Sequence, residues 1–159
     1  GLGPATVGLF FAAQEVTHIS LNPICGRLAD RFGHLYSVGI GVAIMGIALP
    51  FLTFMHSVPV LFLPAFLMGL AQALVFPSTL AMVSLKIDDA NLGAGMGVLG
   101  TMKNVGKVLG PITVGLILYW LDFETVFRSM GVLLIVGGGI WVGVYHARRA
   151  STQEGVTVA

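Results

Sequence analysis

The chain has 159 residues, of which 56% are apolar and only 9% are charged, and its formal net charge is +1. A soluble domain of this length needs a much larger charged share on its surface, so the composition predicts an integral membrane protein. The small net charge excludes the clustered basic surface that binds nucleic acid, and the single cysteine, Cys25, excludes an internal disulfide and a cysteine-based metal site.

Five apolar segments joined by short connectors make up most of the chain. They cover residues 5–23, 35–54, 60–83, 93–119 and 126–145. Each is close to or longer than the roughly 20 residues that a helix needs to cross the hydrocarbon of a bilayer. The sequence therefore predicts an all-α fold, a polytopic bundle of five transmembrane helices over residues 1–150, followed by a polar cytoplasmic tail at 151–159.

The first segment carries polar side chains in the middle of an apolar run. Glu15, His18 and Asn22 are spaced three and four residues apart, which places them along one face of a helix. A polar group in hydrocarbon is costly without a partner, and an ionisable residue at this depth is by default a functional candidate.

The connector after the first segment reads Gly26-Arg-Leu-Ala-Asp-Arg-Phe-Gly-His34. Gly26 and Gly33 are expected to permit a tight turn, and Arg27 and Arg31 to hold the headgroup layer. Asp30 is expected to accept hydrogen bonds from an arginine or from the exposed N–H groups at a helix N-terminus. The pattern predicts a loop on one membrane surface.

The later segments differ from one another in polarity. The second and fifth carry polar residues only near their ends, so we expect them to face lipid. The third and fourth carry polar groups at mid-depth, so we expect them, with the first, to face each other or water. The candidate substrate or proton site comprises Glu15, His18, Asn22, Gln72, Lys103, Asn104 and Lys107. A structural ion pair between Glu15 and a lysine is an equally open interpretation.

The basic residues indicate how the chain is oriented. Five of them fall on one side of the predicted spans and Arg128 on the other; the five are Arg27, Arg31, Lys86, Arg148 and Arg149. By the positive-inside rule the side with five is the cytoplasm. We therefore expect an external N-terminus and a cytoplasmic C-terminus in a plasma or inner cell membrane.

The first connector resembles the Gly-x-Leu-small-Asp-Arg-aromatic-Gly signature of the major facilitator superfamily. His34, Leu35 and Tyr36 stand where that signature usually continues with Arg and Lys, which favours its weaker copy between the eighth and ninth helices. The glycine-rich stretch from Gly93 to Gly115 is similar to the eleventh helix of antiporter and multidrug branches.

This resemblance covers residues 1–150 and implies the eighth to twelfth helices of a transporter. It implies as partners a missing N-terminal half, the bilayer and a small-molecule solute, with Asp30 in a cytoplasmic gating loop. The first residue is not Met and no basic leader follows it, so we expect more chain upstream.

Several other patterns carry no chemistry. Gly95-Met-Gly-Val-Leu-Gly100 fits a dinucleotide fingerprint only as letters, because no strand precedes it. Gly106, Gly110 and Pro111 are expected to pack closely against a neighbouring helix. The sequence predicts neither an enzyme nor a cofactor, and the four histidines lack metal-ligand spacing.

We expect secondary transport by alternating access, with proton coupling through Glu15 and the Lys103 and Lys107 face as one mechanism. A membrane scaffold without transport and an inactive truncated transporter are the alternatives. The scaffold predicts that the buried polar residues pair off and leave no water-accessible cavity.

Overall fold

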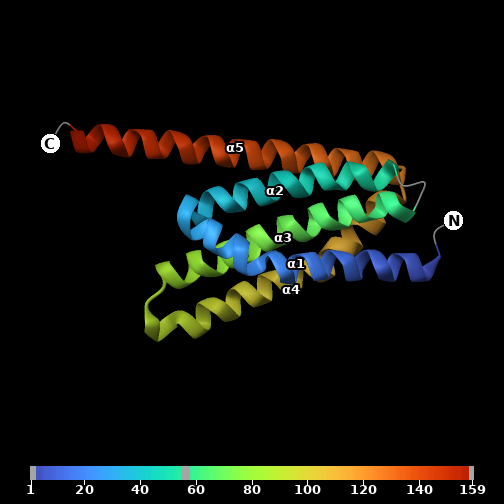
Figure 1. Ribbon diagram of the computed structural model, residues 1–159, viewed down its shortest axis with the longest axis horizontal. Helices are drawn as coiled ribbons and strands as arrows, with labels where there is room; N and C mark the ends of the chain where they lie inside the picture. The colour runs from blue at the N-terminus through green and yellow to red at the C-terminus, as the bar shows by residue number, and fades with distance from the viewer. Residues whose placement is uncertain (1–2, 55–57, 158–159) are drawn as a thin grey trace.

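The computed structural model describes residues 3–54 and 58–157, without the side chains of residues 58, 89 and 146–157. Five long helices make up the described chain, and no strand is found in it (Figure 1). They are α1 (Pro4–Phe32), α2 (His34–Phe51), α3 (Val58–Lys86), α4 (Leu92–Leu118) and α5 (Phe123–Thr157), with short 3-10 turns η1 (Leu52–Phe54) and η2 (Asp89–Asn91). The predicted all-α helix bundle is confirmed.

Some predictions fall on parts of the chain that the structure leaves undescribed. His56 lies outside the described residues, and so do the side chains of His146, Arg148 and Arg149. The backbone of the predicted tail continues α5 as far as Thr157, so this part of the chain is helical.

Gly33 separates the first two helices. Its φ angle is +103°, a conformation that side chains other than glycine rarely adopt, and its N–H donates to the carbonyl of Ala29 at 2.8 Å. The predicted turn at Gly33 is confirmed. The predicted loop before it is wrong, because nothing from Gly26 to Phe32 interrupts the α-helix, and Arg27 and Asp30 therefore lie on the last turns of α1.

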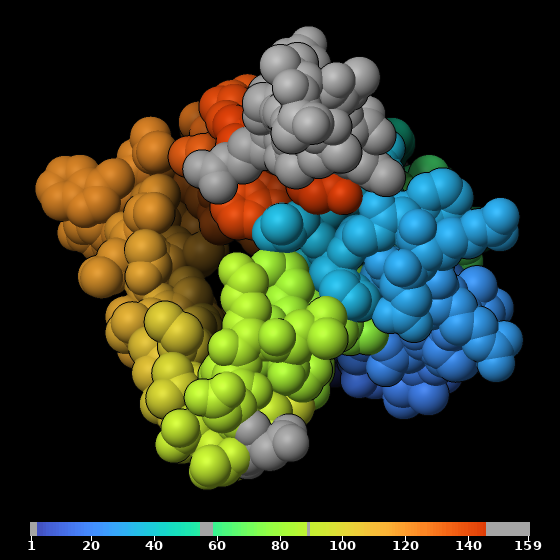
Figure 2. Space-filling model, turned by 90° about the vertical axis from the view of Figure 1, so that its left-hand side faces the viewer, coloured from blue at the N-terminus to red at the C-terminus, as the bar shows by residue number. Residues whose placement is uncertain are grey.

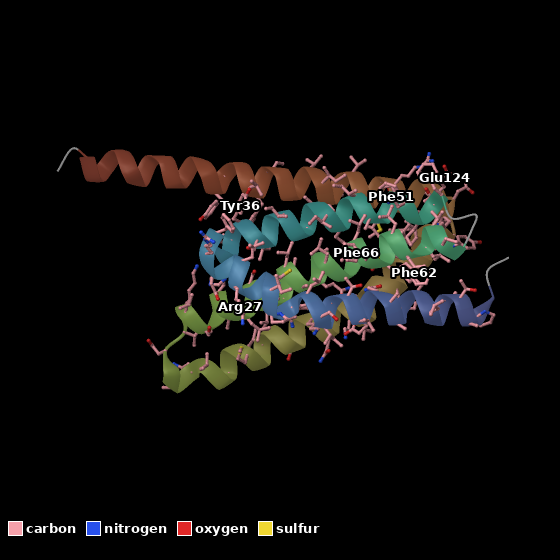
Figure 3. All side chains as sticks on the ribbon, in the orientation of Figure 1. Arg27, Tyr36, Phe51, Phe62, Phe66 and Glu124 are labelled. Atoms are coloured by element: carbon pink, nitrogen blue, oxygen red, sulfur yellow. The ribbon has the colours of Figure 1, made fainter. Side chains whose placement is uncertain are left out.

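The helices run alternately in opposite directions, and α3 lies at the centre of their contacts. It packs against α1 and α2, and α2 packs in turn against α5. In the end-on view of Figure 2, α3 (green) lies between α1 (blue) and α4 (yellow to orange). Arg27 and Glu124 lie at opposite ends of the bundle (Figure 3). The C-terminal ends of α1, α3 and α5 lie at the same end of the bundle (Figure 1).

Glycines set the contact between α2 and α5. A Cβ added to Gly46 would lie 2.7 Å from the Gly131 carbonyl oxygen, and one added to Gly138 would lie 2.9 Å from that of Gly39. The two pairs are seven residues, or about two helical turns, apart on each helix. Glycine therefore faces glycine at two successive points of the crossing. Such backbone approach is the usual packing mode of membrane helices.

The expectation that α2 and α5 simply face lipid is therefore incomplete. Five residues of α2 are buried, because α2 lies between α3 and α5. α5 does expose large apolar side chains along its outer face, namely Val132, Leu133, Val136 and Ile140. Absence of polar residues identified an apolar helix here, but it did not distinguish lipid contact from helix contact.

Three helices of the described chain are long and apolar enough to cross a membrane on length and composition alone. They span His34–Phe54, Pro59–Lys86 and Phe123–Tyr145. α1 and α4, with 29 and 27 residues, are also long enough, but their mid-depth polar residues lower their hydropathy. α1 and α4, which do not belong to this group of three, therefore carry most residues of the candidate substrate or proton site.

Candidate functional site

One face of α1 buries a line of polar side chains. Gln14, His18 and Asn22 recur every four residues, and each has a buried atom without a hydrogen-bond partner in the described chain: Gln14 Oε1, His18 Nε2 and Asn22 Oδ1. We call these three residues the polar stripe. α3 covers it closely, since a Cβ added to Gly69 would lie 2.5 Å from the Gln14 carbonyl oxygen. Buried polar atoms without partners are uncommon and mark sites of strain, hydration or function.

Glu15 lies beside the polar stripe and not on it. Its Oε1 is 3.5 Å from His18 Nδ1, while the Glu15 side chain is 60% exposed and that of His18 only 14%. Glu15 and His18, three residues apart, are thus neighbours on α1. The predicted face is shifted by one residue, because Gln14 and not Glu15 points into the α1–α3 contact.

Phe76 of α3 contacts both other helices of the candidate site. The Nζ of Lys103 lies 4.2 Å from the centroid of its ring, and the His18 ring is 5.4 Å away at an angle of 44°. Gln72 lies one turn earlier on α3 and is half-buried. Sequence reasoning missed Phe76, because one phenylalanine in an apolar helix carries no distinguishing signal.

The ion pair between Glu15 and a lysine, which the sequence left open, is not formed among the described residues. Within the described residues, Glu15 pairs with His18, and no carboxylate lies within 4.0 Å of Lys103 or Lys107. Lys107 and Asn104 are exposed on α4, and Asn104 lines a shallow hollow of about 400 Å³ formed by α4 itself. α1 and α4 are held apart by α3, which explains why the pair is absent.

Most hydroxyl groups at mid-depth need no partner from another helix. Ser78, Thr101 and Thr113 each donate to a carbonyl one turn earlier in their own helix, at 2.6, 2.9 and 2.8 Å. Serine and threonine often satisfy themselves this way in membrane helices. These three hydroxyl groups are therefore no evidence that their helices face each other or water.

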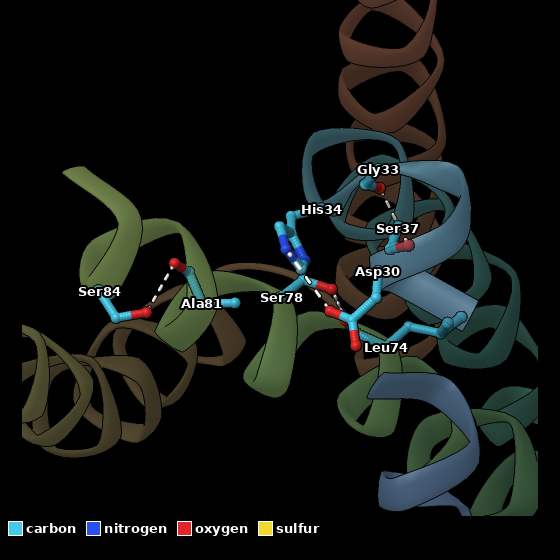
Figure 4. A network of polar contacts seen from close by, with 8 residues as sticks. All are labelled: Asp30, Gly33, His34, Ser37, Leu74, Ser78, Ala81 and Ser84. Carbon is cyan, nitrogen blue, oxygen red and sulfur yellow. Dashed lines mark hydrogen bonds and ion pairs between the residues drawn. The ribbon is translucent and has the colours of Figure 1, made fainter. Parts of the chain in front are cut away.

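A second polar group lies at the turn between α1 and α2 (Figure 4). His34 Nε2 is 3.7 Å from Asp30 Oδ1, and the Asp30 side chain is 72% exposed. His34 Nδ1 is buried without a partner in the described chain. Arg27 and Arg31 are exposed on the same end of α1. The carboxylate of Asp30 is thus open to groups beyond this chain.

α5 fixes this turn from the other side. Trp141 Nε1 donates to the carbonyl of Leu35 at 2.9 Å, and the Tyr36 and Tyr145 rings lie 6.1 Å apart. The Tyr145 hydroxyl would lie 2.7 Å from a Cβ added to Gly33. The turn is therefore packed as well as conformationally restricted.

The end of the bundle opposite the α1–α2 turn contains a cavity of about 880 Å³, which we call the end cavity. It is lined by α1, α2 with η1, α3 and the start of α5, including Phe10, Phe11, Phe127, Asp122 and Glu124. Phe11, one of its lining residues, precedes Gln14 of the polar stripe by three residues on α1.

Among the described residues, Gly106 and Gly110 make none of the predicted close contacts. A Cβ at either position would meet nothing within 4 Å, and Pro111 is exposed. α4, all of whose residues are described, has no buried residue. The close packing of Gly106, Gly110 and Pro111 against a neighbouring helix stays a prediction.

Comparison with known proteins adds a family to this geometry. The sequence model of the Major Facilitator Superfamily matches residues 1–157. The chain is 22% identical over 153 residues to a probable vesicular acetylcholine transporter-A of Danio rerio. It is 24% identical over 155 residues to the quinolone resistance protein NorA of Staphylococcus aureus, and 28% identical over 128 to the tetracenomycin C resistance and export protein of Streptomyces glaucescens.

These matches cover most of this chain but a minor part of each relative. They include 96%, 98% and 79% of the chain, and 30%, 40% and 24% of the respective relatives. The chain thus spans well under half the length of the relatives that it matches.

Proposed function

The chain belongs to the major facilitator superfamily, and from this premise we propose that it acts, within a longer transporter, in moving a small solute across a membrane by alternating access. Its helices would form part of a six-helix half that rocks against an N-terminal half. The basic ends of α1 and α3 would face the cytoplasm, with the N-terminus outside and the C-terminus inside.

The polar stripe is the observation that carries this proposal. A scaffold that only packs helices in lipid would seal its polar groups against one another. Here Gln14, His18 and Asn22 keep buried unpartnered atoms, and no carboxylate in the described chain neutralises Lys103. Such groups are costly in lipid unless water, a proton or a solute reaches them during the working cycle.

Glu15 and His18 would carry the proton that couples transport to a pH gradient. They lie 3.5 Å apart, close enough to exchange a proton directly or through one water. Glu15 is exposed, whereas the Nε2 of His18 is buried, so the pair extends from the accessible side of α1 into its contact with α3. That arrangement supports a role in passing protons inward.

The solute would be a small organic molecule, and the direction would be export. Two of the three relatives described are a quinolone resistance protein and a tetracenomycin C export protein, which supports an antiporter of the efflux type. The end cavity, at about 880 Å³, is in the size range of drug-sized sites and is lined mainly by aromatic and aliphatic side chains.

Transport by the full-length protein in proteoliposomes tests the proposal. A fluorescent quinolone and a cationic dye serve as probe solutes, and an imposed pH gradient supplies the drive. We expect accumulation of at least one probe that collapses when an ionophore removes the gradient. Absence of any probe movement, with correctly folded protein in the membrane, would leave the scaffold as the better interpretation.

Glu15→Gln separates proton coupling from transport itself. The amide keeps the size of Glu15 but cannot carry a proton, so gradient-driven accumulation should be lost while solute exchange without a gradient continues. Ser20→Ala, at another exposed position of α1, is the matched control. Normal gradient-driven accumulation by Glu15→Gln would remove Glu15 from the proton path.

A further inference from the structure

Phe76 of α3 contacts side chains of both α1 and α4. α1 presents the His18 ring to it at 5.4 Å, and α4 presents the Lys103 ammonium at 4.2 Å from the ring centroid. The ring face of an aromatic side chain is electron-rich and attracts cations. One Phe76 ring therefore contacts both the ammonium group of Lys103 and the imidazole of His18, whose charge depends on protonation.

α4 has few other contacts along its length. It has no buried residue, and its contacts with α3 and α5 are slight, whereas α1, α2, α3 and α5 pack extensively. Near its start, Gly95 packs against the side chain of Ile87. Since no carboxylate is near Lys103 in the described chain, the Phe76 ring is the partner of its charge. Among the described residues, the Lys103–Phe76 contact is thus one of the few side-chain contacts that join α4 to α3.

We infer that Phe76 couples the protonation of His18 to the position of α4. With His18 neutral, Lys103 keeps its place on the ring and holds α4 against α3. When His18 gains a proton, a second cation interacts with the same ring and repels Lys103, so Lys103 withdraws and α4 separates from α3. This inference rests on the proposed proton-coupled transport and assigns the residue that links the proton to a helix movement.

The charged groups around His18 are few, so the direction of the coupling is defined. On α1, Glu15 lies 3.5 Å from His18 Nδ1; on α4, Lys103 lies 4.2 Å from the centroid of the Phe76 ring that His18 also contacts. α3 carries one ionisable side chain, Lys86 at its last residue, and α2 carries His34 and Tyr36 in its first turn. By linkage, if protonation of His18 weakens the Lys103–Phe76 interaction, then loss of that interaction favours protonation of His18 by the same free energy.

Distance measurements on the full-length protein in nanodiscs test this coupling. Spin labels at Leu85→Cys on α3 and Val108→Cys on α4, both exposed positions, report the separation of the two helices by double electron–electron resonance. Cys25 is replaced by Ser. We expect the α3–α4 distance distribution to move to longer values between pH 8 and pH 5.

Four variants distinguish coupling from simple packing. Phe76→Leu should give the longer distances at both pH values, whereas Phe76→Trp, which keeps a ring face, should retain the pH-dependent change. His18→Asn should give the shorter distances at both. Glu15→Gln, which removes the carboxylate 3.5 Å from His18 Nδ1, should change the pH dependence of the distance.

The outcomes separate this inference from the proposed function. A pH-dependent distance change that persists in Phe76→Leu or His18→Asn overturns the coupling, even if the protein transports solute. The same is true if no distance change occurs in the unsubstituted protein. A change that follows the four variants supports the coupling even where no probe solute is transported, and then the transport proposal alone fails.

Discussion

Gly138→Ala is the substitution whose effect follows most directly from the geometry. A Cβ at this position would lie 2.9 Å from the carbonyl oxygen of Gly39, 3.0 Å from the N of Ala43 and 3.2 Å from its Cβ. Two of these are backbone atoms of α2, which cannot move without moving the helix. At the neighbouring Gly137, an added Cβ would meet nothing within 4 Å, so Gly137→Ala is a matched control.

The size of the effect comes from the separation that the methyl group requires. Ordinary contact begins at 3.4 Å, so α2 and α5 must part by about 0.5 Å, the difference from 2.9 Å, at a crossing built on backbone contact. Overpacking of this kind costs about 1–3 kcal/mol. Replacing glycine with alanine in a helix also gains roughly 0.5–1 kcal/mol of propensity. Both variants share that gain, so their difference isolates the overpacking.

Reversible unfolding in mixed detergent micelles, followed by circular dichroism, measures this difference. We expect Gly138→Ala to be less stable than Gly137→Ala by about 1–3 kcal/mol, with both retaining helix content before unfolding. Gly131→Ala should match Gly138→Ala, because its Cβ would lie 2.7 Å from the Gly46 carbonyl oxygen. Equal stability of Gly137→Ala and Gly138→Ala would mean that the α2–α5 crossing is looser than its backbone contacts indicate.

Three further predictions concern the turn and the orientation. Gly33→Ala should lower the unfolding free energy by about 1–3 kcal/mol in the same assay, because φ is +103° there; wild-type stability would contradict this. Asp30→Asn should slow transport by the full-length protein roughly tenfold, the equivalent of one charge-assisted hydrogen bond, at unchanged membrane insertion; an unchanged rate would leave Asp30 without a gating role. With the buried Cys25 as a quiet background, Phe123→Cys should react with an impermeant maleimide from outside the cell and Asp88→Cys should not; the reverse pattern would invert the topology.

Helix positions were predictable because they depend on composition and on a few special residues. Long apolar runs specify membrane helices by the cost of unpaired backbone in lipid, and Gly33 ends α1 because its φ is positive. Gly26 shows the limit of that reasoning. A glycine beside charged residues suggested a loop, yet within α1 it keeps ordinary helical hydrogen bonds, and only its tertiary neighbour Pro77 distinguishes it.

The candidate site was predictable in its residues and not in its contacts. Spacing along α1 identified Glu15, His18 and Asn22, but the rotation of the helix decides that Gln14 is buried and Glu15 exposed. That rotation is set by the fit of Gly69 against α1, a contact between segments 55 residues apart, from position 69 to position 14. No pattern within a single helix contains this information, and the same holds for Phe76.

The weak packing of α4 connects the fold to the proposed mechanism. A bundle moves most readily where the fewest buried contacts must be broken, because close-packed interfaces resist gradual deformation. The α2–α5 crossing, with backbone against backbone, is the rigid part of this chain, and α1 with α3 extends it. At mid-length, α4 contacts α3 through the Lys103 ammonium on the Phe76 ring, and within the described residues none of its side chains is buried. A cation over an aromatic ring contributes about 0.5–2 kcal/mol, so a second charge at the same ring is comparable with that single interaction. On the proposed coupling, a proton arriving at His18 would therefore act on α4 before any of the other four helices.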